Sequence, residues 1–266
     1  THWHRDHFGG VEGLAKRVRI NQFWDRGLPE DEHADKDDFP NGPKLDDPLG
    51  IAYRKATLGK RKVLKAGDSL PLKGKTKALV LAASGKVIPL GANPGPHNPL
   101  CADAPPDHPE DRSDNARSVS LKFTLGAFDF LDCGDLTWNI EKQLVCPVDR
   151  VGPIDLYQVT HHGLDVSNHP TLLQTIAPTV AVMNNGPTKG GLASTVHRLQ
   201  SISSIQALYQ LHKNAKTAVD DNTNASLIAN HDEAGGQYIH VSIPDDGARF
   251  NVRIGSDGRD QLFESR

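Results

Sequence analysis

The sequence lacks a long apolar segment. Its run at residues 78–83 is far shorter than the roughly 18 residues that a transmembrane helix requires, and it predicts a buried strand instead. An excess of one charge sign is also missing, since 30 Lys and Arg face 33 Asp and Glu, for a net charge of −3. This balance does not indicate a basic surface for nucleic acid or for an anionic membrane.

Cysteine is scarce as well, with Cys101, Cys133 and Cys146 in 266 residues and no C-x-x-C spacing. An odd number argues against a disulfide scaffold. A single bridge stays open, and with it the compartment: cytoplasm, periplasm or secretion. The hydrophobic share of 37% is sufficient for a core, and 18 Pro with 24 Gly favour many turns over a helical bundle.

Histidine, by contrast, is abundant, with 13 residues. Four potential metal ligands lie within six positions near the start of the chain: His2, His4, Asp6 and His7. Imidazole and carboxylate bind zinc-like divalent cations at about 2.0–2.2 Å. If residues 1–3 end a strand, His2 and His4 point to the same side, and a turn brings Asp6 and His7 round before a helix at 11–18. One segment is therefore expected to serve two adjacent metals; the alternative is a solvated, His-rich terminus or a tag remnant.

Two further clusters follow predicted strands. Asp135 comes after the strand at 128–132 and after a glycine that lets the backbone turn. Its carboxylate can bridge two cations, although a Gly-Asp pair after a strand is by itself usually a turn. The pair His161 and His162 ends the strand at 154–160. One of the two is expected to bind metal, and the alternative is a pair of surface or capping histidines.

A third cluster is the loop at 184–191, which separates a predicted strand at 179–183 from a predicted helix. This loop is expected on the same rim as the other strand ends. Lys189 is predicted to hold a substrate carboxylate or phosphate, and Asn185 to donate to a developing oxyanion. Ordinary loop chemistry is the alternative for both residues.

The order of elements predicts a layered α/β fold, because strands alternate with helices. Strands are expected at 19–24, 62–64, 69–72, 77–83, 119–125, 128–132, 154–160, 179–183 and 205–211, helices at 11–18, 51–60, 137–144, 170–176 and 192–202, and a C-terminal hairpin at 238–254. One domain is expected over residues 1–266. Polar, proline-rich loops at 29–50 and 91–114 are interpreted as insertions, with a lid over the site as the alternative for 29–50.

The first ten residues, Thr-His-Trp-His-Arg-Asp-His-Phe-Gly-Gly, resemble the H-x-H-x-D-H-x-G-G signature of the metallo-β-lactamase fold superfamily. The resemblance implies a four-layer αββα sandwich. It also implies strands and a helix before the motif, so the chain is expected to lack the N-terminal strands of that fold. Asp135 resembles the family's bridging aspartate. His162 matches the family's x-His-Gly ligand better than His161, which is then expected beside the ligands or as proton donor.

The order of motifs is similar to the DNA-uptake competence-protein branch of this superfamily. Ordinary β-lactamases carry another histidine between the first motif and the bridging aspartate, and here the candidates His33, His97 and His108 lie in loops. The competence branch has an Asp/Asn-rich stretch instead, so Asp114 or Asn115 is expected to complete the first metal site, with Asp114 preferred. The branch's histidine near the 184–191 loop is absent here.

The expected ligand sets follow from these matches: His2, His4 and Asp114 for one metal, Asp6, His7 and His162 for the other, and Asp135 as the bridge. Two divalent cations are the expected cofactors, zinc first, with manganese or iron as alternatives. Such a pair lowers the pKa of a shared water, and the resulting hydroxide attacks an electrophilic carbon or phosphorus. Asp6, Asp135 and His161 are the predicted catalytic residues.

The predicted function is therefore that of a binuclear metal-dependent hydrolase, acting on a phosphodiester or another small ester. A lactone or β-lactam hydrolase is the alternative, and a non-catalytic metal-binding module is a third. The expected partner is a small-molecule substrate. Nucleic acid is not supported by charge, because surfaces that track long duplex DNA are normally basic. The oligomeric state is left open.

Overall fold

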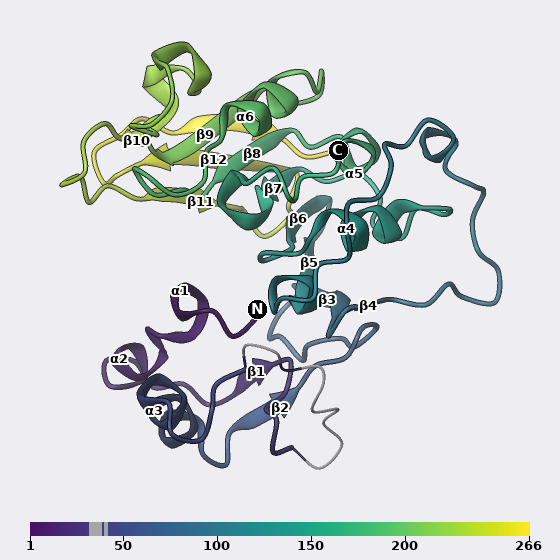
Figure 1. Cartoon of the computed structure of the whole chain (residues 1–266). Helices are drawn as coiled ribbons and strands as arrows, with labels where there is room; N and C mark the ends of the chain where they lie inside the picture. The colour runs from purple at the N-terminus through teal and green to yellow at the C-terminus, as the bar shows by residue number, and fades with distance from the viewer. Residues whose placement is uncertain (32–38, 40–41) are drawn as a thin grey trace.

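The computed structural model describes residues 1–31, 39 and 42–266, and its largest element is an eight-stranded sheet (Figure 1). The strands are β3 (Lys77–Ala83), β4 (Lys86–Val87), β5 (Ser120–Leu125), β6 (Phe128–Asp132), β7 (Leu156–Gln158), β8 (Val180–Met183), β9 (Ala207–His212) and β10 (Ile228–Asn230). Their order in the sheet is β10-β9-β8-β7-β6-β5-β3-β4. Strands β6 to β10 run parallel, whereas β5 is antiparallel to β6 and β3. The carboxyl ends of β6, β7 and β8 therefore meet at one edge.

Helices cover one face of this sheet. They are α4 (Trp138–Val145), α5 (Pro170–Ile176) and α6 (Ala193–Gln200), and each connects two neighbouring parallel strands. Apolar side chains of the helices, such as Leu144, Leu172 and Leu199, pack with Leu131 and Tyr157 of the sheet in the largest buried cluster. Burial of such side chains is the main stabilising contribution to the fold.

A second, three-stranded sheet covers the other face. Its antiparallel strands are β11 (Ile239–Ser242), β12 (Arg249–Ile254) and β13 (Gln261–Glu264). Phe250 and Phe263 of this sheet pack against Phe128 and Val180 of the large sheet. The mixed α/β class is thereby confirmed. The four-layer αββα sandwich is not confirmed by these layers and stays a prediction.

The N-terminal elements gather at one end of the molecule (Figure 1). They are α1 (Arg5–Phe8), α2 (Val11–Ala15), α3 (Pro48–Thr57) and the two parallel strands β1 (Phe23–Asp25) and β2 (Arg61–Val63). The expected strand at residues 1–3 is wrong, because these residues form no strand before α1 begins at Arg5. The expected helix at 11–18 ends already at Ala15. Of the expected strand at 69–72, only a single bridge from Ser69 to Leu79 is formed.

Two connections hold the first residues against the large sheet. The backbone N–H of Val119, just before β5, donates to the carbonyl oxygen of Thr1 at 3.0 Å. The buried Asp114 carboxylate accepts from the backbone N–H of Trp3 at 2.5 Å and pairs with Arg26 at 2.6 Å. Because β5 is antiparallel to β6, both connections lie at the edge where β6, β7 and β8 end.

A disulfide joins Cys101 to Cys146, and Cys133 is a buried free thiol. The single bridge left open by the sequence is thus present, and it fastens the 91–114 loop to the end of α4. In the 29–50 loop, α3 already begins at Pro48. Residues 32–38 and 40–41, which include His33 and part of the expected lid, lie outside the described residues.

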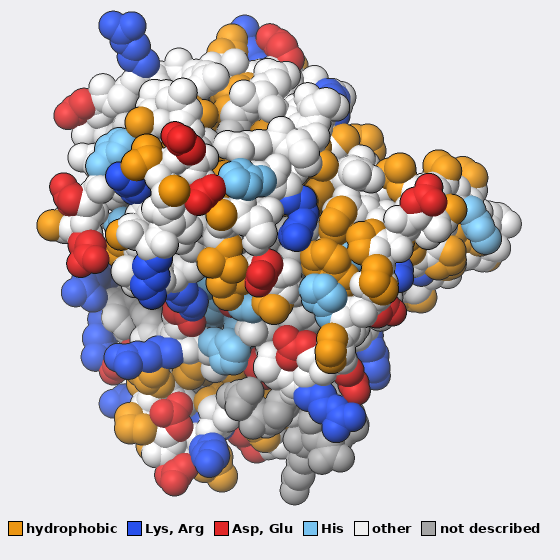
Figure 2. Space-filling view, turned by 45° about the horizontal axis from the view of Figure 1, so that its top comes forward, with side chains coloured by type: hydrophobic (Ala, Val, Ile, Leu, Met, Phe, Trp, Pro, Cys, Tyr) orange, Lys and Arg blue, Asp and Glu red, His pale blue; other side chains and the backbone are white. Residues whose placement is uncertain are grey.

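Across the part of the chain that the structure describes, no helix combines the length and the apolar character needed to cross a bilayer. Basic and acidic side chains are interspersed over the face shown in Figure 2, without one continuous basic area on that face. This distribution agrees with the near-zero charge balance of the sequence.

Candidate metal centre

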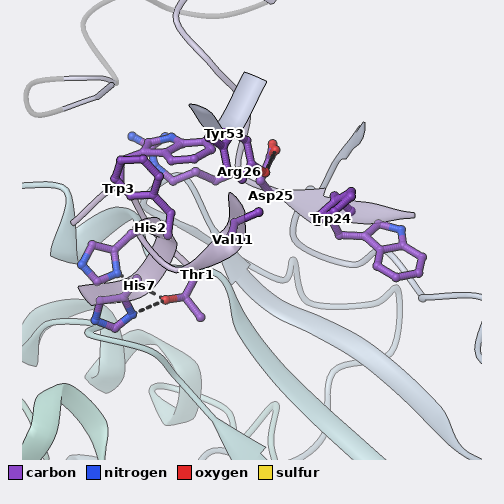
Figure 3. A pocket seen from close by; sticks show the side chains of 11 residues that line it. Thr1, His2, Trp3, His7, Val11, Trp24, Asp25, Arg26 and Tyr53 are labelled. Carbon is purple, nitrogen blue, oxygen red and sulfur yellow. Dashed lines mark hydrogen bonds between the residues drawn. The ribbon is translucent and has the colours of Figure 1, made fainter. Parts of the chain in front are cut away.

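Aromatic packing anchors the segment that carries the first histidines. The Trp3 ring lies 5.4 Å from Phe8 and 5.0 Å from Tyr53, both edge to face, and its indole N–H donates to the Gly27 carbonyl. A pocket of about 100 Å³ lies beside His2 and His7 on this side (Figure 3). It has room for a few water molecules. A whole substrate therefore has to extend from the opposite, open side of the site.

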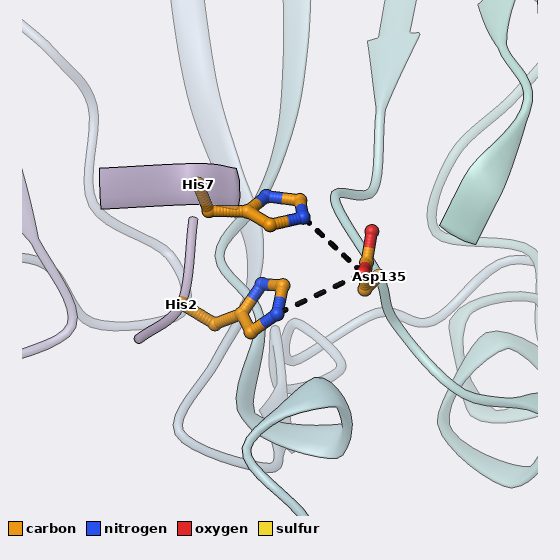
Figure 4. Close-up of side chains that lie close together, drawn as sticks. All are labelled: His2, His7 and Asp135. Carbon is orange, nitrogen blue, oxygen red and sulfur yellow. Dashed lines mark ion pairs between the residues drawn. The ribbon is translucent and has the colours of Figure 1, made fainter. Parts of the chain in front are cut away.

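Asp135 reaches the site because the chain turns sharply after β6. Gly134 has φ of 56°, and a Cβ there would lie 2.8 Å from the Thr1 side chain, so only glycine fits. The backbone N–H of Asp135 donates to Ser118 Oγ at 3.1 Å. The carboxylate then faces His2 and His7 of the first segment (Figure 4).

The two histidines after β7 occupy left-handed backbone conformations. Both His161 and His162 have φ of 56°, which costs a non-glycine residue about 1 kcal/mol or more. The surrounding backbone holds this turn: His161 N–H donates to Gly134 O at 3.0 Å, and Gly191 N–H donates to His162 O at 2.8 Å. The observed strain is typical of a functional site.

Four imidazole Nε2 atoms surround one carboxylate oxygen, Oδ2 of Asp135. The distances are 3.7 Å for His2, 3.2 Å for His7, 3.6 Å for His161 and 3.5 Å for His162. A charge-assisted N–H···O hydrogen bond is shorter, at about 2.7–2.9 Å. Two ligand atoms that are each about 2.1 Å from one tetrahedral ion lie about 3.4 Å apart. The spacing therefore matches neighbouring ligands of a shared cation.

The opposite ring nitrogens of the two strand-end histidines fix their tautomers. His162 Nδ1 lies 2.9 Å from the Asn184 carbonyl oxygen, which only accepts, so Nδ1 carries the hydrogen. Ser167 Oγ gives its own hydrogen to the Leu136 carbonyl at 2.7 Å and therefore accepts from His161 Nδ1 at 3.0 Å. In the neutral rings both Nε2 lone pairs face Asp135, as metal-binding histidines require.

Three of these Nε2 atoms, in His2, His7 and His162, are buried without a hydrogen-bond partner. Unsatisfied buried polar atoms are costly. The described residues contain two groups whose ligand atoms all lie within 4.8 Å of one another: His2, His7 and Asp135, and Asp6, His7 and His162. This donor set of neutral imidazoles and carboxylates fits divalent transition metals.

Burial and charge give these groups the protonation states that metal binding needs. Burial is the main reason why the pKa of His2 is lowered to about 2, and burial also lowers the pKa of His161. Burial acts to raise the pKa of Asp135, but the close approach of His162 and His7 outweighs it and lowers that pKa below its usual range. The Asp135 carboxylate in turn raises the pKa of His162, so a proton and a cation compete for its Nε2.

Asp6 connects the site to the loop after β8. Its Oδ2 lies 3.2 Å from His162 Nε2 and accepts a hydrogen bond from Lys189 Nζ. Partial burial acts to raise the pKa of Asp6, but Lys189 outweighs this effect and the pKa falls to about 2. The Lys189 side chain is 55% exposed, so it lies at the open rim of the site.

Other predicted residues lie differently from the expectation. His4 is adjacent to His2, with ring centroids 4.6 Å apart, but it belongs to neither ligand group. Both oxygens of Asp114 are engaged by Arg26 and the Trp3 N–H, so this carboxylate orients the first segment and is not directed at a metal. Asn115, the alternative to Asp114, lies closer, with Nδ2 3.4 Å from His161 Nε2.

The expected role of Asn185 is also not supported. This side chain is buried, and its amide group donates to the carbonyls of Gly186 and His212 at 3.1 and 2.7 Å. It therefore stabilises the loop after β8. Sequence reasoning had assigned no role to the supporting residues Thr1 and Ser118. Both hydroxyls lie within 3.3 Å of His2 Nδ1, and single hydroxyl residues in a sequence give no signal for such contacts.

Comparisons with known proteins add little to this geometry. No family model matches the sequence, and no curated protein matches it. Among solved structures, a chain from Parabacteroides distasonis ATCC 8503 described as a "putative metal-dependent hydrolase" is 18% identical, with a TM-score of 0.33. The match covers 62% of this chain and 70% of that chain. A likeness of this size carries no argument about function, which therefore depends on the site itself.

Proposed function

We propose that this protein is a metal-dependent hydrolase with a binuclear centre at the edge where β6, β7 and β8 end. The observation that carries the proposal is the set of four Nε2 atoms within 3.2–3.7 Å of Asp135 Oδ2. An ion-free arrangement of this kind leaves buried nitrogens unsatisfied. Bound cations compensate both the buried carboxylate and the lone pairs.

The residues have separate roles in this proposal. His2, His7 and Asp135 would hold one cation, and Asp6 and His162 would hold the other, with Asp135 shared between the two sites. Zinc is the first expectation, with manganese or iron as alternatives. When bound, two such ions lower the pKa of a shared water toward neutrality and stabilise charge that develops on a substrate oxygen.

His161 is proposed to move a proton. Its Nδ1–H donates to Ser167, so its Nε2, which lies 3.4 Å from Asn115 Nδ2, is the atom that would exchange a proton at the site. This Nε2 lies 3.6 Å from Asp135 Oδ2, on the side of the carboxylate that faces the histidine cluster. Burial lowers the pKa of His161 and favours the neutral ring, whose Nε2 would accept a proton from the attacking water and return it to the leaving group.

The proposed substrate is a small phosphodiester or another small ester. The narrow pocket behind His2 and His7 has no room for a large group, so the substrate lies toward Asp6 and Lys189. Lys189 is the one cationic side chain hydrogen-bonded to a proposed ligand among the described residues. An anionic group of the substrate can replace Asp6 as the hydrogen-bond partner of the Lys189 ammonium. This contact favours phosphate esters over neutral lactones as substrates.

A panel of chromogenic substrates tests this proposal. Protein reconstituted with zinc or manganese is assayed with a bis-aryl phosphate, an aryl phosphonate ester, a lactone and a cephalosporin, and the Asp135→Ala variant serves as the control. Hydrolysis of the phosphodiester by the loaded protein alone supports the proposal. Cephalosporin as the sole good substrate would overturn the ranking, and no turnover by metal-loaded protein would favour a metal-binding module.

A further inference from the structure

A second pocket lies at the opposite end of the β3–β5 pair from the metal centre. It has a volume of about 480 Å³, which is within the range of small-molecule binding sites. Strand β3 begins at Lys77, which pairs with Thr124 near the end of β5, and Leu79 pairs with Lys122. Directly opposed residues of antiparallel strands share a face, so these four side chains form one wall of the pocket.

The charged groups that line this pocket are all cationic: Lys77, Lys122 and Arg150. Lys122 is partly neutralised, since its Nζ lies 2.9 Å from Asp129 and donates to the Val151 carbonyl. Lys77 and Arg150 form no ion pair with any carboxylate in the described part of the chain. The pocket therefore carries positive charge that the surrounding residues do not balance.

Arg150 is the most informative of these groups. Its NH1 group donates to the carbonyls of Gln143, Cys146 and Val148, in the last turn of α4 and the segment after it, which fixes the guanidinium in place. Its Nε–H is buried without a hydrogen-bond partner. Burial lowers its pKa, with no acidic neighbour to oppose the effect. This partly exposed guanidinium has carbonyl acceptors but no carboxylate partner, so an anion in the pocket would gain a charge-assisted contact with it.

Apolar side chains complete the lining, chiefly Leu70, Leu72 and Leu79. We propose that this pocket is a binding site for a small organic anion, with its acidic group beside Lys77 and Arg150 and its apolar group against the three leucines. This site is separate from the metal centre and does not depend on the proposed hydrolase activity. A carboxylate, sulfonate or phosphate carrying about one ring fits the volume and the lining.

Isothermal titration calorimetry with benzenesulfonate tests the proposal, because this probe is an apolar anion that cannot be hydrolysed as an ester. The full chain should bind one equivalent. Lys77→Glu should weaken binding by about tenfold or more, because it removes one charge-assisted contact and adds a repulsive one. Lys75→Glu makes the same charge change at an exposed position outside the pocket and should leave the affinity unchanged.

Two further variants separate the sites. Leu72→Trp fills the cavity without a change in charge and should abolish binding, whereas Asp135→Ala should leave it intact. The proposal is overturned if no saturable binding occurs, if Lys75→Glu weakens binding as much as Lys77→Glu, or if Asp135→Ala removes it. The last result would place the anion at the metal centre.

Discussion

His7 Nε2 lies 3.2 Å from Asp135 Oδ2, although 128 residues separate the two in the chain. The histidine comes from α1 and the aspartate from the turn after β6, so only the tertiary fold brings them together. Three more imidazoles share the same carboxylate oxygen at similar distances. This convergence is the physical basis of the proposed metal chemistry and of the first three predictions.

The purified protein should carry about two equivalents of a divalent transition metal, since two cations with one bridging carboxylate account for the ligands. Elemental analysis by mass spectrometry measures this content. Removal of the metal with a chelator should lower the melting temperature, because ions that bind only the folded state stabilise it. Protein without metal, even after reconstitution with zinc, manganese and iron, would end the binuclear interpretation.

Asp135→Ala should abolish turnover while the far-ultraviolet circular dichroism stays nearly unchanged. Loss of the bridging carboxylate removes a ligand of both cations, so the rate should fall by a factor on the order of 10³ or more. Asp257→Ala, at an exposed position, is the matched control and should retain full activity. Appreciable activity in Asp135→Ala would contradict the bridging role.

Ser167→Ala should lower kcat while leaving the metal content unchanged. This hydroxyl accepts from His161 Nδ1 and fixes its tautomer, and loss of such supporting partners typically costs about 10–100-fold. Nitrogen-15 NMR of the His161 ring should show a mixture of tautomers in the variant. Ser203→Ala, an exposed serine, is the control. An unchanged ring spectrum together with an unchanged kcat would exclude a positioning role for Ser167.

Glu141→Gln should stabilise the protein above neutral pH. Burial raises the pKa of Glu141 from 4.5 to about 7, so the folded state binds this proton more tightly than the unfolded state. The corresponding stability is present below pH 4.5 and is lost as the pH rises through about 7. The difference in free energy of unfolding between the variant and the wild type should therefore be about 1–3 kcal/mol more favourable to the variant at pH 8 than at pH 5. Urea denaturation at both pH values measures the difference, and equal effects would refute the shift.

Replacement of Cys101 and Cys146 by serine should lower the free energy of unfolding by about 2–4 kcal/mol, because the bridge closes a loop across a sequence separation of 45. Chemical denaturation of the double variant tests this. Cys133→Ser is an unsuitable control because this thiol is fully buried. Wild-type protein under reducing conditions serves instead and should match the double variant.

The sequence predicted the positions of functional groups better than their partners. Asp135 and the His161-His162 pair were placed at strand ends because apolar runs are followed there by glycine and polar residues, and the structure places both at the same edge. The strands at 119–125 and 128–132 were likewise predicted, and the structure pairs them as β5 and β6. These signals are local, so a single sequence is sufficient to detect them.

Long-range contacts were beyond such reasoning. Asp114 was expected at the metal, but its pairing with Arg26 depends on a contact 88 residues away in the chain. The short strands β10 and β13 were missed because each has three or four residues and gains its stability from neighbouring strands. Residues 1–3 were expected to end a strand, but within the described part of the chain their one backbone hydrogen bond toward the large sheet joins Thr1 to Val119, just before β5.

The Asp114 carboxylate has a consequence for the order in which the protein loosens. It joins the Trp3 amide and the Arg26 side chain to the residues before β5. The first segment is therefore held by these buried contacts on one side, and by the proposed metal ions at its histidines on the other. Without ions, the histidine side of the segment loses its support, while the Asp114 contacts and the packing of Trp3 remain. Amide protons of residues 1–8 should then exchange with deuterated solvent well before those of β6 and β7, and metal should close this gap.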